Sequence, residues 1–220
     1  MMNYLATIAT ASTLALSAGA ASAVTVNLGV PGDVTSGIGT ATGTFASGFL
    51  TGTITADAGP LGNPSITQDP TNGLGVSAGF LDPDDAIEDQ GRSESLTIGF
   101  DQVAVLKSIT AGFVDLFDEW DITVFGTGGD LDFSASAAST GPSPYTLDFG
   151  AGIEATGFVI SAEGGTCLEQ GIWFCRDFNE NDVALKSFEV SPVPLPAAGW
   201  MLLAGLGGIA AMKRRKKADA

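Results

Sequence analysis

The chain has 220 residues, of which 25 are acidic, nine are basic and none is histidine, so its formal net charge at pH 7 is -16. Without histidine, the chain has no Ser-His-Asp or Cys-His catalytic pair and no histidine-ligated zinc site, and its two cysteines cannot complete a four-cysteine zinc site. A nucleic-acid-binding surface is not expected either, because only four basic residues stand between Val24 and Val193 against 24 acidic ones, and phosphate neutralisation requires clustered lysine and arginine.

Residues 1–23 predict a cleaved secretory signal peptide. They contain no acidic group, and an apolar run of small residues from Leu5 to Ala18 is followed by Ala21, Ser22 and Ala23. Signal peptidase accepts this small-x-small pattern, so cleavage is expected after Ala23. The segment departs from the usual signal in having no lysine or arginine before the apolar run. A short buried helix is the alternative, although nothing in the segment is patterned for one helical face.

The segment from residue 24 to residue 191 is predicted to be one acidic, all-β domain. Apolar and polar residues alternate, as around Leu96, Ile98 and Phe100, and Gly-Pro, Asp-Pro and Gly-Gly pairs separate many of the alternating runs. No crossover-helix pattern stands between the runs, which favours antiparallel strands packed in two layers as a jelly-roll-like β-sandwich. The expected strands are 24–30, 45–55, 76–81, 96–100, 103–115, 120–124, 131–135, 145–149, 156–162, 171–178 and 183–190.

Two stretches of this domain carry a further expectation. The Gly/Ser/Thr/Ala-rich residues 35–55 form either a pair of strands with small side chains or a mobile arm, and the sequence does not decide between the two. In the last strand, the apolar pair Val183 and Leu185 is followed, after a shift of one residue, by Phe188 and Val190. A β-bulge between the two pairs would bring all four side chains to the buried face.

The densest acidic group predicts a calcium site in a loop. Six carboxylates within thirteen residues repel one another unless water or a shared cation separates them, and Ca²⁺ prefers flexible arrays of six to eight oxygen ligands. The loop is not an EF-hand, because Ile87 stands where that loop requires glycine. A solvated acidic turn is the alternative. The six residues are Asp82, Asp84, Asp85, Glu88, Asp89 and Glu94.

A second acidic group is a further candidate for metal binding. It lies at the expected turn between two strong strands, where carboxylates would again crowd together. Its members are Asp115, Asp118, Glu119 and Asp121.

The two cysteines, Cys167 and Cys175, predict a disulfide across a short hairpin. In an exported protein with only two cysteines, a structural disulfide is the favoured interpretation. A redox-active pair is not expected, because the C-x-x-C spacing is absent.

The end of the chain predicts a short transmembrane segment with its basic end in the cytoplasm. Residues 197–212 carry no charge, and sixteen helical residues reach about 24 Å, a little less than a hydrocarbon core of about 30 Å. Local thinning of the bilayer or snorkelling of the flanking bases absorbs such a mismatch. Five basic residues follow and mark the cytoplasmic side, so the acidic domain lies outside. They are Lys213, Arg214, Arg215, Lys216 and Lys217.

The tail, residues 192–220, has the order of parts found in a known sorting signal. The motif Val193, Pro194, Leu195, Pro196 and Ala197, then the apolar segment and then the basic cluster resemble the VPLPA variant of the PEP-CTERM sorting signals. The resemblance implies export across an inner membrane, temporary anchoring there, and processing near the motif by an exosortase, a membrane-embedded cysteine protease. An ordinary permanent C-terminal anchor is the alternative.

These inferences predict a cell-surface or extracellular-matrix protein whose body is in the periplasm during transit. Carbohydrate binding is the preferred activity, because jelly-roll sandwiches commonly hold calcium in a loop and stack sugars on exposed aromatic residues. The candidate aromatics are Trp120, Tyr145 and Trp173, each of which is otherwise a core or interface residue. The alternative is a structural matrix component bridged by calcium. Catalysis is not expected: a glycosidase could operate on two carboxylates, but the sequence selects no pair.

Overall fold

The computed structural model describes residues 22–59, 62–79, 86–88, 94–114, 118–136, 143–162 and 182–193. These residues form an all-β domain of twelve strands joined in one sheet by antiparallel pairs, and they contain no helix. The described residues therefore include no helix that could cross a membrane. Residues 1–21 of the predicted signal peptide and the whole predicted membrane segment lie outside them. The strands are β1 Val24–Asn27, β2 Val34–Ser36, β3 Thr42–Ser47, β4 Leu50–Asp57, β5 Ser65–Asp69, β6 Gly73–Ser77, β7 Ile87–Glu88, β8 Ser95–Gly112, β9 Glu119–Gly126, β10 Gly129–Ser136, β11 Tyr145–Ala162 and β12 Asp182–Pro192.

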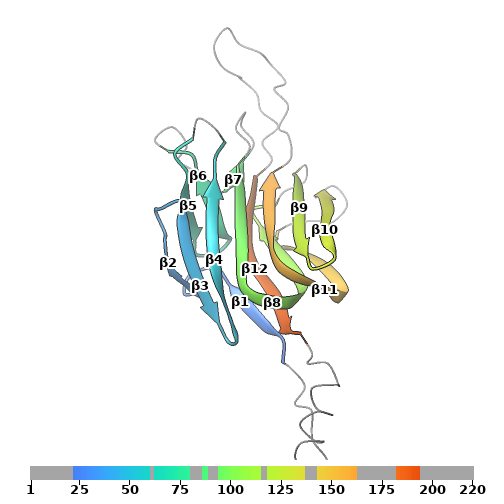
Figure 1. Ribbon diagram of the computed structural model, residues 1–220. Coiled ribbons are helices and arrows are strands. Elements are labelled where there is room, and N and C mark those ends of the chain that lie inside the picture. The colour runs from blue at the N-terminus through green and yellow to red at the C-terminus, as the bar shows by residue number, and fades with distance from the viewer. Residues whose placement is uncertain are drawn as a thin grey trace, which may run out of the picture.

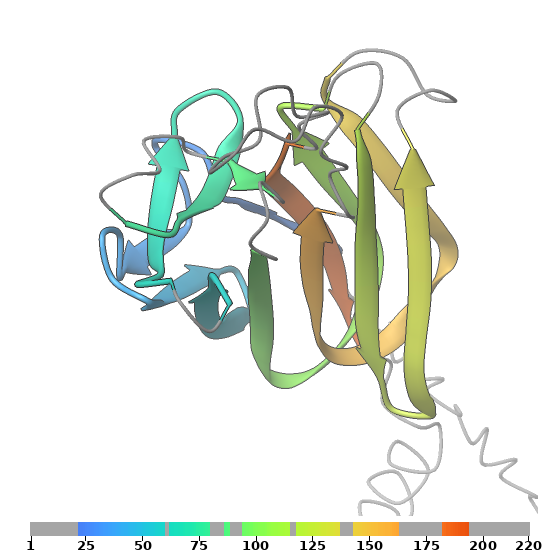
Figure 2. The same cartoon turned by 90° about the horizontal axis from the view of Figure 1, so that it is seen from above.

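Two long strands, β8 and β11, fold the sheet into two layers. They pair with each other along their length, from Ser95↔Ser161 to Ala111↔Tyr145. On its other edge β8 pairs with β4 up to Phe100 and then with β12 from Ala104 onward. Figures 1 and 2 show both strands turning over at the same end of the molecule. The sheet therefore packs against itself as a sandwich.

The residues at the two bends account for the turning. In β8 the alternation of buried and exposed positions is interrupted by Asp101, Gln102 and Val103, all exposed. In β11 the bend contains Gly150 and Gly152, whose φ angles are +62° and +89°. This left-handed region favours glycine because it has no Cβ. The pairing register of β11 and β8 shifts at the same place, which bends a strand pair sharply.

The first layer has the strand order β2-β3-β4-β8-β11-β9-β10, with the first half of β8 and the second half of β11. The second layer contains β5, β6, β12, the second half of β8 and the first half of β11, and β1 and β7 pair with β12. A parallel bridge between Ile38 and Ile66 joins the layers along one side, where Gly39 N donates to Ile66 O at 2.8 Å and Ile66 N donates to Thr40 O at 2.8 Å.

Four phenylalanine rings fill the space between the layers. Phe188 of β12 lies 5.5 Å from Phe45 of β3, 5.7 Å from Phe100 of β8 and 5.3 Å from Phe158 of β11, measured between ring centroids. The first and third contacts are edge-to-face and the second is stacked, which are favourable geometries for aromatic pairs. Phe188 thus connects the second layer to three strands of the first.

The predicted all-β class and antiparallel pairing are confirmed. The undecided stretch 35–55 forms strands β2, β3 and β4. The predicted β-bulge is confirmed as well: the register of β12 against β8 shifts between Leu185 and Ser187, and all four apolar side chains of this strand are buried.

Several strand boundaries were wrong. The expected strands 96–100 and 103–115 are the two halves of β8, and 145–149 and 156–162 are the two halves of β11, because bent strands look like separate strands in an alternation pattern. The expected strand 45–55 is a hairpin that turns at Gly48, whose φ is +57°. Strand β5 was not predicted, and β6 lies earlier than the expected 76–81. The expected strand 171–178 lies outside the described residues.

Replacing Phe188 by alanine tests the role of the central ring. Phe188→Ala is expected to lower the free energy of unfolding by about 3–5 kcal/mol, because a cavity opens where three rings meet. Val103→Ala, at an exposed position, is expected to change it by less than about 0.5 kcal/mol. Urea unfolding followed by circular dichroism measures both. Equal effects of the two substitutions would contradict the central role of Phe188.

Candidate functional site

The outer face of the first layer carries a row of hydroxyl groups. Every second residue of β4 is exposed, so Thr51, Thr53 and Thr55 point outward while the residues between them are buried. Thr42 and Thr44 of β3 are exposed as well, and the register pairs Thr42 with Thr55 and Thr44 with Thr53. Side chains at paired positions of adjacent strands lie side by side. The hairpin therefore presents its threonines as one patch.

This patch is hollowed into a groove of about 340 Å³, here called the hydroxyl groove. Thr44 Oγ1 lies 2.7 Å from Thr35 Oγ1 and 2.8 Å from Ser36 Oγ. A Cβ at Gly99 of β8 would lie 2.8 Å from Thr53 Oγ1, so the glycine leaves room beside that hydroxyl. Hydroxyl groups both donate and accept hydrogen bonds, and the groove contains no charged residue. Its lining residues are Ser36, Thr42, Gly43, Thr44, Thr53 and Thr55.

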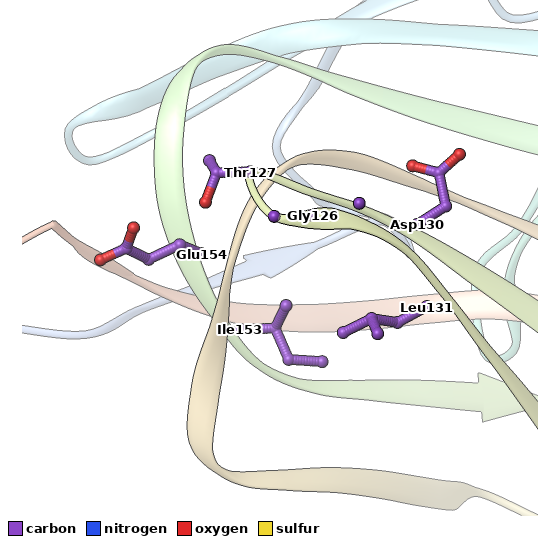
Figure 3. A pocket seen from close by; sticks show the side chains of 8 residues that line it. Gly126, Thr127, Asp130, Leu131, Ile153 and Glu154 are labelled. Carbon is purple, nitrogen blue, oxygen red and sulfur yellow. The ribbon is translucent and has the colours of Figure 1, made fainter.

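A second hollow, of about 300 Å³, lies at the turn between β9 and β10 and is here called the turn hollow. Figure 3 shows the carboxylates of Asp130 and Glu154 on two sides of it and the aliphatic side chains of Leu131 and Ile153 near each other. Thr127 N donates to Glu154 O at 3.0 Å, which attaches the turn to β11. The hollow is lined by Gly126, Thr127, Gly128, Gly129, Asp130, Leu131, Ile153 and Glu154.

The described members of the two acidic groups lie at the same end of the sandwich. Asp182 at the start of β12 pairs with Glu88 of β7, and Asp182 N donates to Asp118 Oδ1 at 3.4 Å. Glu94 directly precedes β8, and Ser95 pairs with Ser161, whose other partner is Asp121 of β9. Glu94 and Asp118 are each only 2% exposed. The strand directions thus bring together acids that lie far apart in the chain.

Not all of the predicted calcium ligands can be placed. Asp82, Asp84, Asp85, Asp89 and Asp115 lie outside the described residues. Within the part of the chain that the structure describes, no three acidic side chains form a metal-binding group. Glu119 is exposed and Asp121 is half-buried. The calcium site stays a prediction.

The aromatic candidates for sugar stacking are not available as a platform on the described surface. Trp120 is 1% exposed and belongs to the core. Tyr145 is half-buried and meets Trp120 edge-to-face, with ring centroids 5.6 Å apart. Trp173 lies outside the described residues, as do Cys167 and Cys175, whose disulfide stays a prediction. The core role, which was the alternative for Trp120, is therefore the one that the structure supports.

The predicted processing sites flank the described domain. Ala23 is exposed and directly precedes β1, and Val193 directly follows β12. Val24 pairs with Val190, so the two ends of the domain lie side by side. They lie at the end opposite Asp118 and Glu88, because β12 runs from the acidic end to Pro192. The remaining residues of the sorting motif and the basic cluster lie outside the described residues.

Sequence reasoning had not identified either hollow. The alternating threonines of residues 42–55 were the available signal for the hydroxyl groove, but the patch forms only through the pairing of β3 with β4. The turn hollow joins residues 126–131 with Ile153 and Glu154, which no local pattern connects.

Comparisons of this chain with protein-family models, with curated proteins and with solved structures found no match.

Proposed function

We propose that the protein is an exported cell-surface or matrix component, a binding protein rather than an enzyme, whose jelly-roll-like sandwich binds neutral polysaccharide in the hydroxyl groove. The observation that carries this proposal is the groove itself, about 340 Å³ lined by five hydroxyl side chains and no charge. Sugar hydroxyls can exchange hydrogen bonds with such side chains without burying an unpaired charge. The strongly acidic body would repel uronic-acid polymers, so the neutral class is favoured.

The arrangement of the two ends supports the export part of the proposal. A signal peptide removed at Ala23 and a membrane tail starting near Ala197 would leave the domain from the same place, since Val24 pairs with Val190. The four residues 193–196 reach at most about 14 Å when extended. The domain would then stand close to the membrane, with its acidic end directed away from anionic headgroups.

The Pro-rich motif would be accessible to a processing protease. Pro194 and Pro196 disfavour helix in the residues just after β12, so an extended segment would separate the folded domain from the bilayer. An exosortase-type protease acting there would release the domain into the envelope or the medium. The apolar segment 197–212 and the basic cluster 213–217 would serve only in transit.

A second candidate role is calcium bridging by the acidic end, as in a purely structural matrix protein. The observation that favours it is the contact of Asp118 with the start of β12, at the end of the sandwich where Glu94 precedes β8. Ca²⁺ bound there would join loops that repel one another without it. Calcium at this end would also allow the acidic domain to associate with acidic polymers.

The glycan proposal is tested by removing hydroxyls from the groove. Thr53→Val and Thr55→Val together preserve side-chain shape and β-propensity, and they are expected to weaken retention on a neutral polysaccharide at least tenfold. Thr25→Val, at an exposed position of β1, is the matched control and is expected to leave retention unchanged. Affinity electrophoresis on a panel of neutral polysaccharides measures it. Unchanged retention of the double variant, or no retention of the wild type on any panel member, would refute the proposal.

The calcium role is tested by thermal unfolding in excess Ca²⁺ and in chelator. Ca²⁺ at about 100 times its dissociation constant would stabilise the fold by about 2.7 kcal/mol, which raises Tm by several degrees. The shift is expected to shrink in Glu94→Gln and Asp118→Asn, and to persist in Asp130→Asn at the opposite end. A wild-type Tm that chelator leaves unchanged would eliminate this role.

Export and processing are tested by the mass of the protein recovered from envelope and medium fractions. The mature form is expected to begin at Val24 and to lack the residues after the Pro-rich motif. Replacing Pro194 and Pro196 by alanine is expected to retain the longer form in the membrane, because the segment could then continue as helix. An intact 220-residue chain in the cytosol would contradict the proposal.

A further inference from the structure

We propose that the turn hollow is a second binding site, one that accepts polysaccharides made of amino sugars with free ammonium groups. It differs from the hydroxyl groove in charge, in location and in the strands that build it. The inference extends the proposed glycan-binding function to a second class of polymer, but it uses none of the groove residues.

The charge of the hollow selects a cationic ligand. Asp130 and Glu154 are both exposed, and no basic side chain lines the hollow. Among the described residues the basic side chains are Lys107 and Lys186, and the Nζ of Lys107 donates to Ala151 O at 2.5 Å. The ammonium groups of a polymer could therefore lie near carboxylates on two sides of the hollow, and no basic side chain lines it. Anionic polymers would be repelled by the same two groups.

The hollow also offers an apolar surface, on the side of the turn away from Asp130. Leu131 is 44% exposed, although it is a large aliphatic residue, and Ile153 is half-buried beside it. The C–H faces of a pyranose ring can cover such side chains and remove them from water. An isolated ammonium ion could use the carboxylates but would leave the aliphatic pair uncovered.

The turn leaves its backbone accessible to hydroxyl groups. A Cβ built at Gly128 or Gly129 would have no atom within 4 Å, so the space outside the turn is open. Thr127 adds an exposed hydroxyl at the same turn. A sugar can use these polar groups, whereas the side chain of a lysine has no hydroxyl to offer them. The chemistry of the hollow thus favours an amino sugar over a lysine-rich peptide.

The hollow is held in place by the fold. The hydrogen bond from Thr127 N to Glu154 O joins the turn to β11, and the bend at Gly150 and Gly152 brings Ile153 and Glu154 to that turn. Phe133 of β10 and Phe149 of β11 meet behind it, with ring centroids 5.0 Å apart. Because this backbone hydrogen bond holds the turn against β11, ligand binding would not have to order the backbone there.

The test compares the hexamer of glucosamine with the hexamer of N-acetylglucosamine by titration calorimetry on the purified full chain. Acetylation removes the ammonium charge, so the glucosamine hexamer is expected to bind at least tenfold more tightly at low salt, with a preference that falls as salt rises. Asp130→Asn combined with Glu154→Gln is expected to abolish the preference. Leu131→Ser is expected to weaken binding of the glucosamine hexamer about threefold.

A matched control separates the hollow from the general acidity of the domain. Asp57→Asn combined with Glu119→Gln removes the same number of exposed carboxylates at the opposite end, and it is expected to change affinity less than twofold. Equal weakening by the two double variants would overturn the proposal in favour of bulk charge. Equal affinity for the two hexamers, or no binding of either, would overturn it as well.

Two further arms identify the ligand class and the site. A lysine hexamer that binds as tightly as the glucosamine hexamer, with the same loss in the Asp130→Asn and Glu154→Gln variant, would overturn the sugar assignment in favour of a basic peptide. The groove variant Thr53→Val with Thr55→Val is expected to keep full affinity for the glucosamine hexamer. A failure of the hydroxyl groove can therefore be told apart from a failure of the turn hollow.

Discussion

The contact of Phe188 with three other phenylalanine rings joins the two layers of the sandwich. The rings come from β3, β8, β11 and β12, so one buried cluster joins both layers. The bulge in β12 is part of this arrangement, because it brings Phe188 and Leu185 to the same buried side despite the shift between them. Without the bulge, one of the two apolar pairs of the last strand would face water. In β3, β4 and β11, the packing of the buried residues also determines which residues face outward, because successive side chains of a strand point to opposite faces.

Local alternation was sufficient to predict the class of the fold but not the course of its longest strands. The period of two identified most of the strands, and the phase shift in β12 revealed the bulge, because both are properties of neighbouring residues. Asp101 and Gln102 were left between two expected strands, whereas β8 bends there and continues. β5 was missed because Ile66 is its only fully buried residue. The pairing of β12 with β1, β6 and β8 is set by the core as a whole, which no local pattern contains.

The candidate sites show the same limit. Groups made of neighbouring residues could be predicted from the sequence, whereas hollows made of residues far apart in the chain could not. The acidic groups were conspicuous in the sequence because their members are neighbours, and the structure brings Glu94 and Asp118 to one end through strand direction. The hydroxyl groove required the register of Thr42 with Thr55, and the turn hollow required the bend of β11. Trp120 shows the opposite case: it was a candidate for sugar stacking, but it lies on the buried face of β9 together with Ile122 and Val124.

The distribution of charge along the sandwich would give the two proposed binding sites different partners. The acids that meet near Asp118 and Glu88 lie at the end away from Val24 and Pro192, while the turn hollow lies at the end where the domain begins and ends. Ala155, next to Glu154, pairs with Ala104, and Ala104 pairs with Pro192. Two strand spacings, about 10 Å, therefore separate the hollow from Pro192 at the end of β12. If the domain is anchored at its C-terminal end as proposed, a cationic polymer in the turn hollow would lie beside the membrane, between the acidic domain and anionic headgroups, and would reduce the repulsion between the two. A neutral polymer in the hydroxyl groove, on the outer face of β3 and β4, would run along the side of the domain and leave that charge balance unchanged.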